Sequence, residues 1–216
     1  MLALLLVDSP LAATLTVSSS GTYTTIQAAV DAASDGDTIS ITAGTWRECV
    51  DLKGLDLTIT GASQSTTTVD GNGCSAGAFS MTLGETAEIQ SLTITNSSYP
   101  AVVVESSFLT LDDVLIESSG SVTSSRDGGA VYADNSYVEI TDSTLDDNAG
   151  YYGGAISLQS ASALVVDNVE FTNNSAQFGG AISLEDASSA DITSCTFEGG
   201  LVSVSGYGKG GAIYSY

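Results

Sequence analysis

The stretch GGAISLQSASALVVDNVEFTNNSAQFGGAISL, residues 153–184, begins and ends with the same motif. A Gly-Gly-Ala-Ile or Gly-Gly-Ala-Val motif starts at Gly128, Gly153, Gly179 and Gly210, in steps of 25, 26 and 31 residues. Between two copies, apolar residues mostly alternate with Ser, Thr, Asp or Glu, which is the pattern of a strand with one buried face. The chain is therefore predicted to repeat one strand-bearing unit of about 25 residues.

Aligning the repeats gives continuous columns of apolar residues. The columns are Ile94, Ile116, Leu145, Phe171 and Phe197; Leu92, Val114, Ser143, Val169 and Cys195; Ile89, Leu111, Ile140, Val166 and Ile192; and Phe79, Val102, Val131, Ile156, Ile182 and Ile213. An antiparallel sandwich does not require one residue class at one point of every repeat, whereas a parallel solenoid does, because equivalent positions stack. We predict an all-β, right-handed parallel β-helix that forms a single domain over residues 14–216.

The repeats also contain residues suited to tight corners. The paired glycines fit corners with positive φ, which glycine adopts at little cost. Asp147, Asn148, Asn173 and Asn174 follow the last apolar residue of their strands. Asn and Asp tolerate left-handed geometry and bond to nearby backbone, so we interpret all four as structural rather than catalytic.

Residues 24–33 precede the repeats and are predicted to form a short amphipathic helix. Thr24 and Gln27 fit a capping box, and Asp35-Gly36 fits a helix stop. The apolar face consists of Ile26, Ala29, Val30 and Ala33. We expect this helix to cap the open N-terminal end of the solenoid, with the first coil beginning at Asp37.

The two ends of the sequence carry further expectations. Residues 1–13 combine a short apolar run with small residues, and we interpret them as the remnant of a secretory signal peptide. The last motif, from Gly210, stops midway through a coil. We therefore expect further repeats or an anchor beyond residue 216.

Charge and composition exclude several classes of function. The 216 residues include 26 acidic and 4 basic ones, for a net charge of −22. Nucleic acids and anionic membrane surfaces need clustered Lys and Arg, so neither is an expected partner. No stretch is long and apolar enough for a transmembrane span. The absence of His and of a Cys-x-x-Cys motif argues against zinc, haem and copper.

The three cysteines divide into a predicted pair and a single residue. Cys49 and Cys74 are 25 residues apart, about one coil, and adjacent coils lie ~4.8 Å apart, so we predict a disulfide. Such a bond fits an exported protein. Cys195 falls in a core column, and we interpret it as a small buried apolar residue.

Two sets of motifs resemble known families. Gly21–Val30, with the later Gly36-Asp-Thr-Ile39 and Ala43-Gly-Thr-Trp46, is similar to the cap and first coil of pectin-lyase-like β-helix proteins. The Gly-Gly-Ala-Ile copies and Phe171-Thr-Asn-Asn174 resemble the GGAI and FxxN repeats of polymorphic outer-membrane proteins. The stretch 145–148 is a weaker FxxN copy, and residues 197–200 lack the Asn. The resemblance implies an extracellular or cell-surface location, such as the outer membrane, and specifies fold more than function.

We therefore weigh two classes of function. The first is a non-catalytic secreted or cell-surface module, an adhesin-like, passenger or stalk domain whose partners are cell-surface glycans or proteins. The alternative is a polysaccharide lyase or glycoside hydrolase of the pectin-lyase-like fold. Arg126 beside Asp127 has the residue types that lyase chemistry needs, but it lies on a Ser/Gly-rich corner. We assign no catalytic residue.

Two groups of residues are candidate binding sites. Tyr132 and Tyr214 are predicted to share one outward column, and Tyr151 and Tyr152 to lie on a corner, where their rings can stack on sugars. Ordinary surface tyrosines are the simpler interpretation of all four. Asp113 and Asp142 are predicted to stack outward on adjacent coils, where Ca²⁺ would relieve the repulsion between them. A solvated acidic stripe is the simpler interpretation of this second pair, and we prefer it to a metal site. Apart from Ca²⁺, no cofactor is expected.

Overall fold

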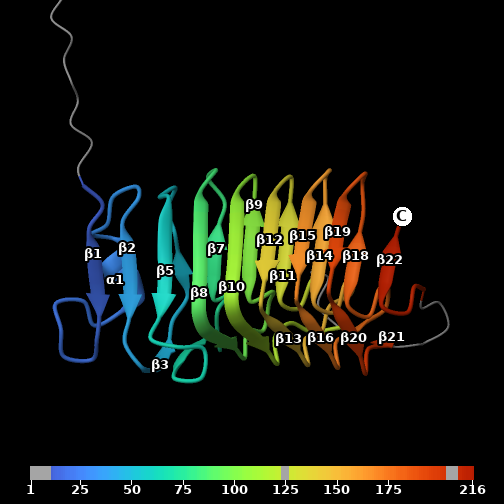
Figure 1. Cartoon of the computed structure of the whole chain (residues 1–216), viewed down its shortest axis with the longest axis horizontal. Coiled ribbons are helices and arrows are strands. Elements are labelled where there is room, and N and C mark those ends of the chain that lie inside the picture. Colours follow the sequence, from blue (N-terminus) through green and yellow to red (C-terminus); the bar gives the residue numbers. More distant parts are fainter. Residues whose placement is uncertain (1–10, 123–126, 203–208) are drawn as a thin grey trace, which may run out of the picture.

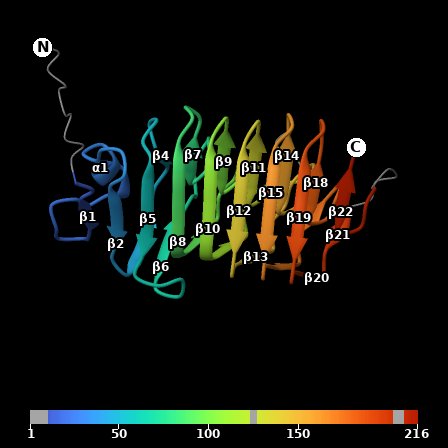
Figure 2. The same cartoon turned by 45° about the horizontal axis from the view of Figure 1, so that its top comes forward.

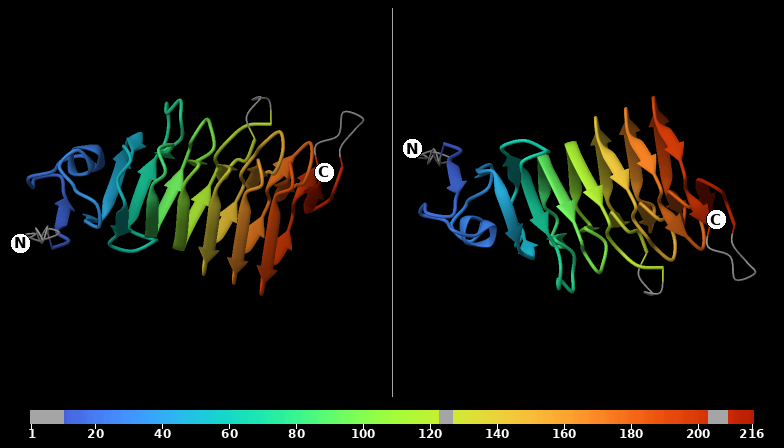
Figure 3. Two further views of the ribbon diagram at one scale, coloured as in Figure 1. Left: turned by 90° about the horizontal axis from the view of Figure 1, so that it is seen from above. Right: turned by 90° about the horizontal axis from the view of Figure 1, so that it is seen from below.

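A computed structural model describes residues 11–122, 127–202 and 209–216. The strands run in parallel from coil to coil and stack along one axis, with β1 and β22 at opposite ends (Figures 1 and 2). The views from above and below show the coils following one another along this axis in sequence order (Figure 3). The predicted parallel β-helix is confirmed.

Each full coil contributes strands to three faces. Face I consists of β1 (Thr14–Val17), β2 (Thr38–Ile41), β5 (Leu57–Gly61), the first halves of β8 (Thr86–Thr95) and β10 (Phe108–Glu117), β12 (Tyr137–Thr141), β15 (Ala163–Asp167) and β19 (Ser189–Thr193). Face II consists of β3 (Gly44–Arg47), β6 (Thr67–Asp70), the second halves of β8 and β10, β13 (Thr144–Asp146), β16 (Glu170–Thr172) and β20 (Thr196–Glu198). Face III consists of β4 (Val50–Asp51), β7 (Phe79–Met81), β9 (Val102–Glu105), β11 (Val131–Asp134), β14 (Ile156–Gln159), β18 (Ile182–Leu184) and β22 (Ile213–Ser215). A short ladder of β17 (Ser175–Ala176) and β21 (Leu201–Val202) follows face II.

The strand register reproduces the predicted columns. On face I, Ile140 pairs with Leu111 on one side and with Val166 on the other, and Val166 pairs with Ile192. The other columns continue in the same way along faces II and III. Ile140 and Val166 are fully buried, and Ile192, near the end of the stack, is partly buried against the core. Equivalent apolar residues therefore form one continuous core along the axis.

Left-handed residues turn the chain between the faces. Between faces I and II the same corner position has φ near +50° in five successive coils. Its occupants are Ser91, Asp113, Asp142, Asn168 and Ser194. At the corner before face III, Gly153 has φ +59°, and a Cβ atom there would lie 1.9 Å from the carbonyl oxygen of Ile156. This corner therefore excludes every side chain, as the paired glycines predicted.

The predicted structural role of the asparagines is confirmed at the corner after face II. Asn148 and Asn174 are buried. Each donates its side-chain amide to a main-chain carbonyl oxygen of the preceding coil, Asn148 to Ile116 at 2.9 Å and Asn174 to Leu145 at 2.7 Å. Their side-chain oxygens accept backbone N–H groups of the preceding coil. They thus satisfy backbone groups where the chain turns.

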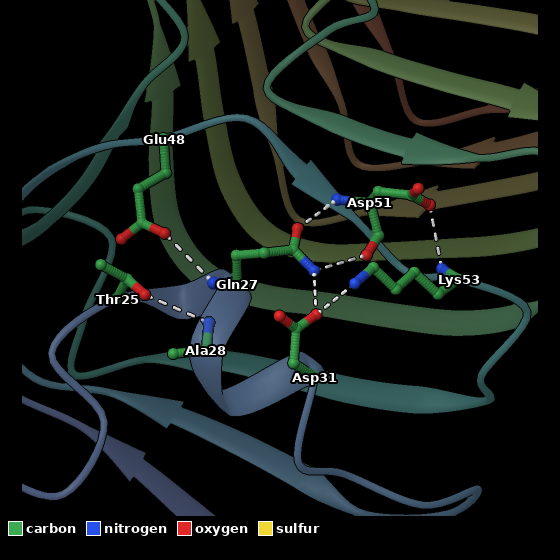
Figure 4. A network of polar contacts seen from close by, with 7 residues as sticks. All are labelled: Thr25, Gln27, Ala28, Asp31, Glu48, Asp51 and Lys53. Atoms are coloured by element: carbon green, nitrogen blue, oxygen red, sulfur yellow. Dashed lines mark hydrogen bonds and ion pairs between the residues drawn. The ribbon is translucent and has the colours of Figure 1, made fainter.

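The N-terminal helix is present but differs in detail from the expectation. Helix α1 spans Ile26–Val30, and its N-cap is Thr25 rather than Thr24. The Thr25 hydroxyl accepts the N–H of Ala28, while Gln27 forms other hydrogen bonds, so the predicted capping box is wrong (Figure 4). Three of the four predicted face residues, Ile26, Ala29 and Val30, are buried, and Ala33 lies beyond the helix and is partly buried.

The helix occupies a place in the first coil that a strand of face III takes elsewhere. The first coil begins at β1 and not at Asp37, because β1 pairs with β2 before the helix starts. Helix α1 contacts β1, β2 and β4, and the Glu48 carboxylate accepts the N–H groups of Ile26 and Gln27. The helix thus covers the N-terminal edge of face III.

The predicted disulfide links the second and third coils. Cys49 and Cys74 are bonded, with their Cα atoms 5.5 Å apart. Cys195 is a free thiol that is partly buried against the core, next to the last coils. No helix in the described part of the chain has the length and apolar character needed to cross a membrane.

Candidate functional site

An aromatic group lies at the corner that leads into face III. Tyr151 and Tyr152 precede Gly153, and Phe178 precedes Gly179, so the repeat places them at the same corner of adjacent coils. Tyr152 pairs with Phe178 in an isolated parallel bridge, and Phe178 pairs with Lys209. Tyr214 comes from β22 on face III. We call Tyr151, Tyr152, Phe178 and Tyr214 the aromatic corner.

The four rings pack on one another across three coils. Tyr152 stacks on Phe178 with ring centroids 4.9 Å apart and an interplanar angle of 19°. Tyr151 meets Tyr152 edge to face at 5.0 Å, and Tyr214 lies 5.3 Å from Phe178 and 6.4 Å from Tyr152. All four side chains remain partly exposed, although their rings pack on one another. Partly exposed aromatic rings of this kind offer apolar surface to a ligand.

Polar side chains lie on face III beside the rings. The register aligns Tyr132, Ser157, Ser183 and Tyr214 in one outward column. Ser157 and Ser183 alternate with inward apolar residues and therefore point outward, yet both are fully buried. Other side chains must cover this part of the face. The Ser157 hydroxyl oxygen has no hydrogen-bond partner among the described residues. A buried unpaired hydroxyl is uncommon in folded proteins.

Asp127 is held by groups from the next coil. Gln159 donates its amide to Asp127 at 2.7 Å and accepts the Tyr132 hydroxyl at 3.2 Å. Burial raises the pKa of Asp127 above its ordinary value, against the opposing effect of hydrogen bonds from the Tyr152 backbone and from Gln159. The Asp127 carboxylate is therefore oriented but only partly stabilised in its charged form.

Glu185 is the second carboxylate of this region. It follows β18, and the Ser183 hydroxyl donates to it at 3.0 Å. Burial raises its pKa, and the negative charges of Asp127 and Asp186 raise it further. Burial also raises the pKa of Tyr152, followed by the charges of Glu185 and Asp127. Both carboxylates therefore act on the same tyrosine of the aromatic corner.

Glu85 shows how a structural carboxylate differs from this pair. Burial alone would raise its pKa, but N–H groups that include those of Leu83 and Gly54, together with the Ser107 hydroxyl, hold the pKa below its ordinary value. Glu85 is fully buried and stabilised as an anion. Asp127 and Glu185 have fewer donors and raised pKa values, which is the pattern of functional carboxylates.

The structure brings together three of the four predicted tyrosines. Tyr151, Tyr152 and Tyr214 belong to the aromatic corner. Tyr132 shares the outward column of Tyr214 as predicted, but two serine positions separate them, and Tyr132 bonds to Gln159. Arg126 lies outside the described residues.

The two candidate calcium ligands share one corner position, as predicted. Asp113 accepts a hydrogen bond from the Ser91 hydroxyl at 3.0 Å, and Asp142 accepts one from the Asn168 amide at 2.6 Å. Within the described ranges, no three acidic or Cys side chains are grouped to hold a metal ion. These two carboxylates have neighbours that accommodate them in the corner.

Sequence reasoning missed Gln159, Phe178 and Glu185, and it assigned Asp127 to a corner without function. A signal for them existed in the repeat. Asp127 and Phe178 each directly precede a glycine pair, as Tyr152 does. Gln159 and Glu185 each follow the apolar run of their face III strand by one residue. Reading the columns outside the core would have placed these residues together.

The comparisons agree with this architecture. A family model described as "Right handed beta helix region" matches residues 56–215. The chain belongs to this family of right-handed β-helices. No curated protein has a sequence that matches this β-helix.

Two solved structures share the fold of this β-helix. Pectin methylesterase PemA from Erwinia chrysanthemi is 14% identical with a TM-score of 0.57, and 95% of this chain covers 80% of that one. A pectin methylesterase in complex with a hexasaccharide is 15% identical with a TM-score of 0.50 and the same coverage. The pectin-lyase-like fold is therefore shared with these enzymes, while identities this low do not transfer an activity.

Proposed function

We propose that this protein is a secreted or cell-surface β-helix module that binds glycans at the aromatic corner without converting them. The observation that supports this most is the packed row of Tyr152, Phe178 and Tyr214 across successive coils. Sugar rings present C–H groups that pack on aromatic faces, and their hydroxyls need polar partners. Gln159, Asp127 and Glu185 supply such partners beside the rings.

The test is a glycan array followed by calorimetry with the best ligand. Tyr152→Ala removes the central ring and is expected to weaken binding about tenfold, the effect of losing one stacking contact. The matched control is Tyr137→Ala, because Tyr137 and Phe108 form a ring pair on face I, 6.1 Å apart. Binding that is unchanged by Tyr152→Ala but weakened by Tyr137→Ala would place the site elsewhere and contradict the proposal.

A polysaccharide lyase or glycoside hydrolase is the second candidate, and the carboxylate pair favours it. A carboxyl group with a raised pKa is suited to hold the proton that a leaving group needs, while a second carboxylate acts as base. Asp127 and Glu185 each have a raised pKa, and the negative charge of Asp127 contributes to the raised pKa of Glu185. The shared fold with pectin methylesterases is compatible with either class of function.

Activity against a panel of polysaccharides separates the two candidates. An enzyme would release new chain ends, and Asp127→Asn or Glu185→Gln would lower the rate at least about a hundredfold, the size of a general acid–base contribution. Asp186→Asn is the matched control, because Asp186 is exposed and adjacent to Glu185. No release from any polysaccharide, together with specific binding, would favour the non-catalytic module.

We also propose a repeat class and a cellular location for this protein. The Gly-Gly-Ala motifs and the buried Asn148 and Asn174 support membership of the GGAI and FxxN repeat class of surface passengers. The Cys49–Cys74 disulfide supports an extracellular location, because such bonds persist outside the reducing cytosol. Localising the full-length protein on intact cells with an antibody, with and without surface proteolysis, tests both.

A further inference from the structure

The carboxylates at the aromatic corner lack a basic partner in the described part of the chain. In the described part of the chain, the side-chain ion pairs are Arg47 with Asp70 and Lys53 with Asp31, and both lie at the N-terminal end of the solenoid. Among the described residues, Asp127 and Glu185 have only neutral hydrogen-bond donors, Gln159 and the Tyr152 backbone for the first and Ser183 for the second. Charges that are partly buried without a counterion cost free energy, which a cationic ligand would recover.

The surroundings of these carboxylates suit a cation that is part of a larger ring-shaped ligand. The Tyr152 ring is within the electrostatic influence of both Asp127 and Glu185 and stacks on Phe178. An ammonium group is attracted both by carboxylates and by the faces of aromatic rings. The same rings provide the apolar platform on which a sugar packs.

The third observation is an unpaired buried hydroxyl in the column beside these carboxylates. Ser157 lies on face III between Tyr132 and Ser183, is fully buried, and its hydroxyl has no partner among the described residues. Ser183, the next residue in this column, uses its hydroxyl to hold Glu185. This column thus contains one hydroxyl that orients a carboxylate and one that has no partner among the described residues.

We propose that the aromatic corner binds a saccharide that carries a protonated amine, with its ring on Tyr152 and Phe178 and its ammonium against Asp127 and Glu185. This inference rests on the glycan-binding function proposed above and names the class of glycan. It disfavours uronate chains, because their carboxylates would meet two like charges on a protein of net charge −22. Lys209 follows Phe178 in the corner column, but its side chain is exposed and forms no ion pair with either carboxylate.

Calorimetry with three tetrasaccharides at pH 6 tests the inference on the native chain. The probes are the glucosamine tetramer, the N-acetylglucosamine tetramer and the galacturonate tetramer. We expect the glucosamine tetramer to bind about tenfold more tightly than the acetylated one, and the galacturonate tetramer to show no binding. Glu185→Gln and Asp127→Asn should each remove most of this preference, whereas Asp186→Asn should keep it.

Spermine distinguishes a specific site from general attraction to an acidic surface. Non-specific binding would give spermine and the glucosamine tetramer similar affinities, and neither would respond to Tyr152→Ala. That result would overturn the inference, as would equal affinities for the acetylated and free tetramers. In the latter case binding that still depends on Tyr152 would leave the glycan-binding function standing, so the two failures are distinguishable.

The comparison of acetylated and free tetramers needs no variant. If a carboxylate variant does not fold, as judged by its melting curve, the preference of the native chain and its loss at high salt still decide the inference. A preference that survives 1 M salt unchanged would contradict an ion pair.

Discussion

The side-chain amide of Gln27, on α1, forms two hydrogen bonds with the backbone of Asp51, on β4. The Asp51 N–H donates to the Gln27 oxygen at 2.8 Å, and the Gln27 nitrogen donates to the Asp51 carbonyl oxygen at 3.1 Å (Figure 4). A glutamine amide carries the same donor and acceptor as a peptide group. Gln27 therefore takes the place of a neighbouring strand at the edge of face III, where an open sheet edge would otherwise remain.

Replacing Gln27 tests this view of the cap. Gln27→Ala leaves the N–H and C=O of Asp51 to water and is expected to lower the free energy of unfolding by about 1–2 kcal/mol. Urea denaturation measures the change. Gln90→Ala is the control, because Gln90 lies on β8 between two paired coils. Equal effects of the two substitutions would mean that the edge contact contributes nothing specific.

The disulfide is expected to stabilise the first coils. Replacing Cys49 and Cys74 together by Ala opens a loop of 25 residues and should cost about 3 kcal/mol of unfolding free energy. Guanidinium denaturation of the double variant and of the reduced native chain should give the same lowered midpoint. Cys195 is a free thiol, so reductant should lower the denaturation midpoint of Cys195→Ser and of the native chain by the same amount.

The glycine at the corner before face III should tolerate no side chain. In Gly153→Ala the new methyl group would meet the Ile156 carbonyl oxygen at 1.9 Å, so we expect a loss of more than about 3 kcal/mol or failure to fold. Gly73 also has positive φ, but nothing lies within 4 Å of a Cβ atom there. Gly73→Ala should therefore cost only about 1–2 kcal/mol, the backbone contribution alone. Similar melting temperatures for the two variants would contradict this account.

The carboxylate at Glu185 should make stability depend on pH with an unusual sign. Its pKa is raised in the fold, so the folded chain binds more protons than the unfolded chain, and stability falls as pH rises through the raised pKa. Glu185→Gln should therefore raise the melting temperature at pH 7 and leave it unchanged well below pH 4.5, the ordinary value for Glu.

Glu85 provides the opposite control for that measurement. Its pKa is lowered in the fold, so its contribution is present above the ordinary value of 4.5 and is lost as pH falls through the lowered pKa. Glu85→Gln should lower the melting temperature at pH 7. If Glu185→Gln also lowered the melting temperature at pH 7, Glu185 would be stabilised as an anion and would not be a strained functional group.

The acidic corner of Asp113 and Asp142 is expected not to respond to calcium. Ser91 and Asn168 already donate hydrogen bonds to these carboxylates, and no third acidic group joins them in the described part of the chain. Millimolar CaCl₂ should therefore leave the melting temperature unchanged. A rise that Asp113→Asn and Asp142→Asn abolish would instead establish the metal site that the sequence suggested.

The corner residues show how far the sequence predicts local structure. Gly153 and Asn148 could be assigned to corners because positive φ and unsatisfied backbone groups restrict the residue type at each position. The N-cap was misplaced by one residue, since Thr24 and Thr25 are chemically equivalent caps and only the position of the Glu48 carboxylate against the helix start distinguishes them.

The candidate site was predictable only in part. The tyrosines stood out in the sequence because exposed aromatic residues are few. Asp127 and Glu185 are 58 positions apart by residue number and belong to different repeats, and acidic residues are common throughout the chain. Their interaction follows from the burial and the coil-to-coil register, neither of which a local pattern records.

The amino-acid sequence by itself determined the solenoid, its columns and the Cys49–Cys74 bond. In a parallel stack, each coil must bury the same positions and turn at the same corners, so the same residue class recurs at each of these positions. Only the tertiary structure decided which outward side chains meet. Outward positions are free of the core's packing constraint, so the grouping of the aromatic corner with Asp127 and Glu185 depends on the register between coils and on contacts such as the Gln159–Asp127 hydrogen bond.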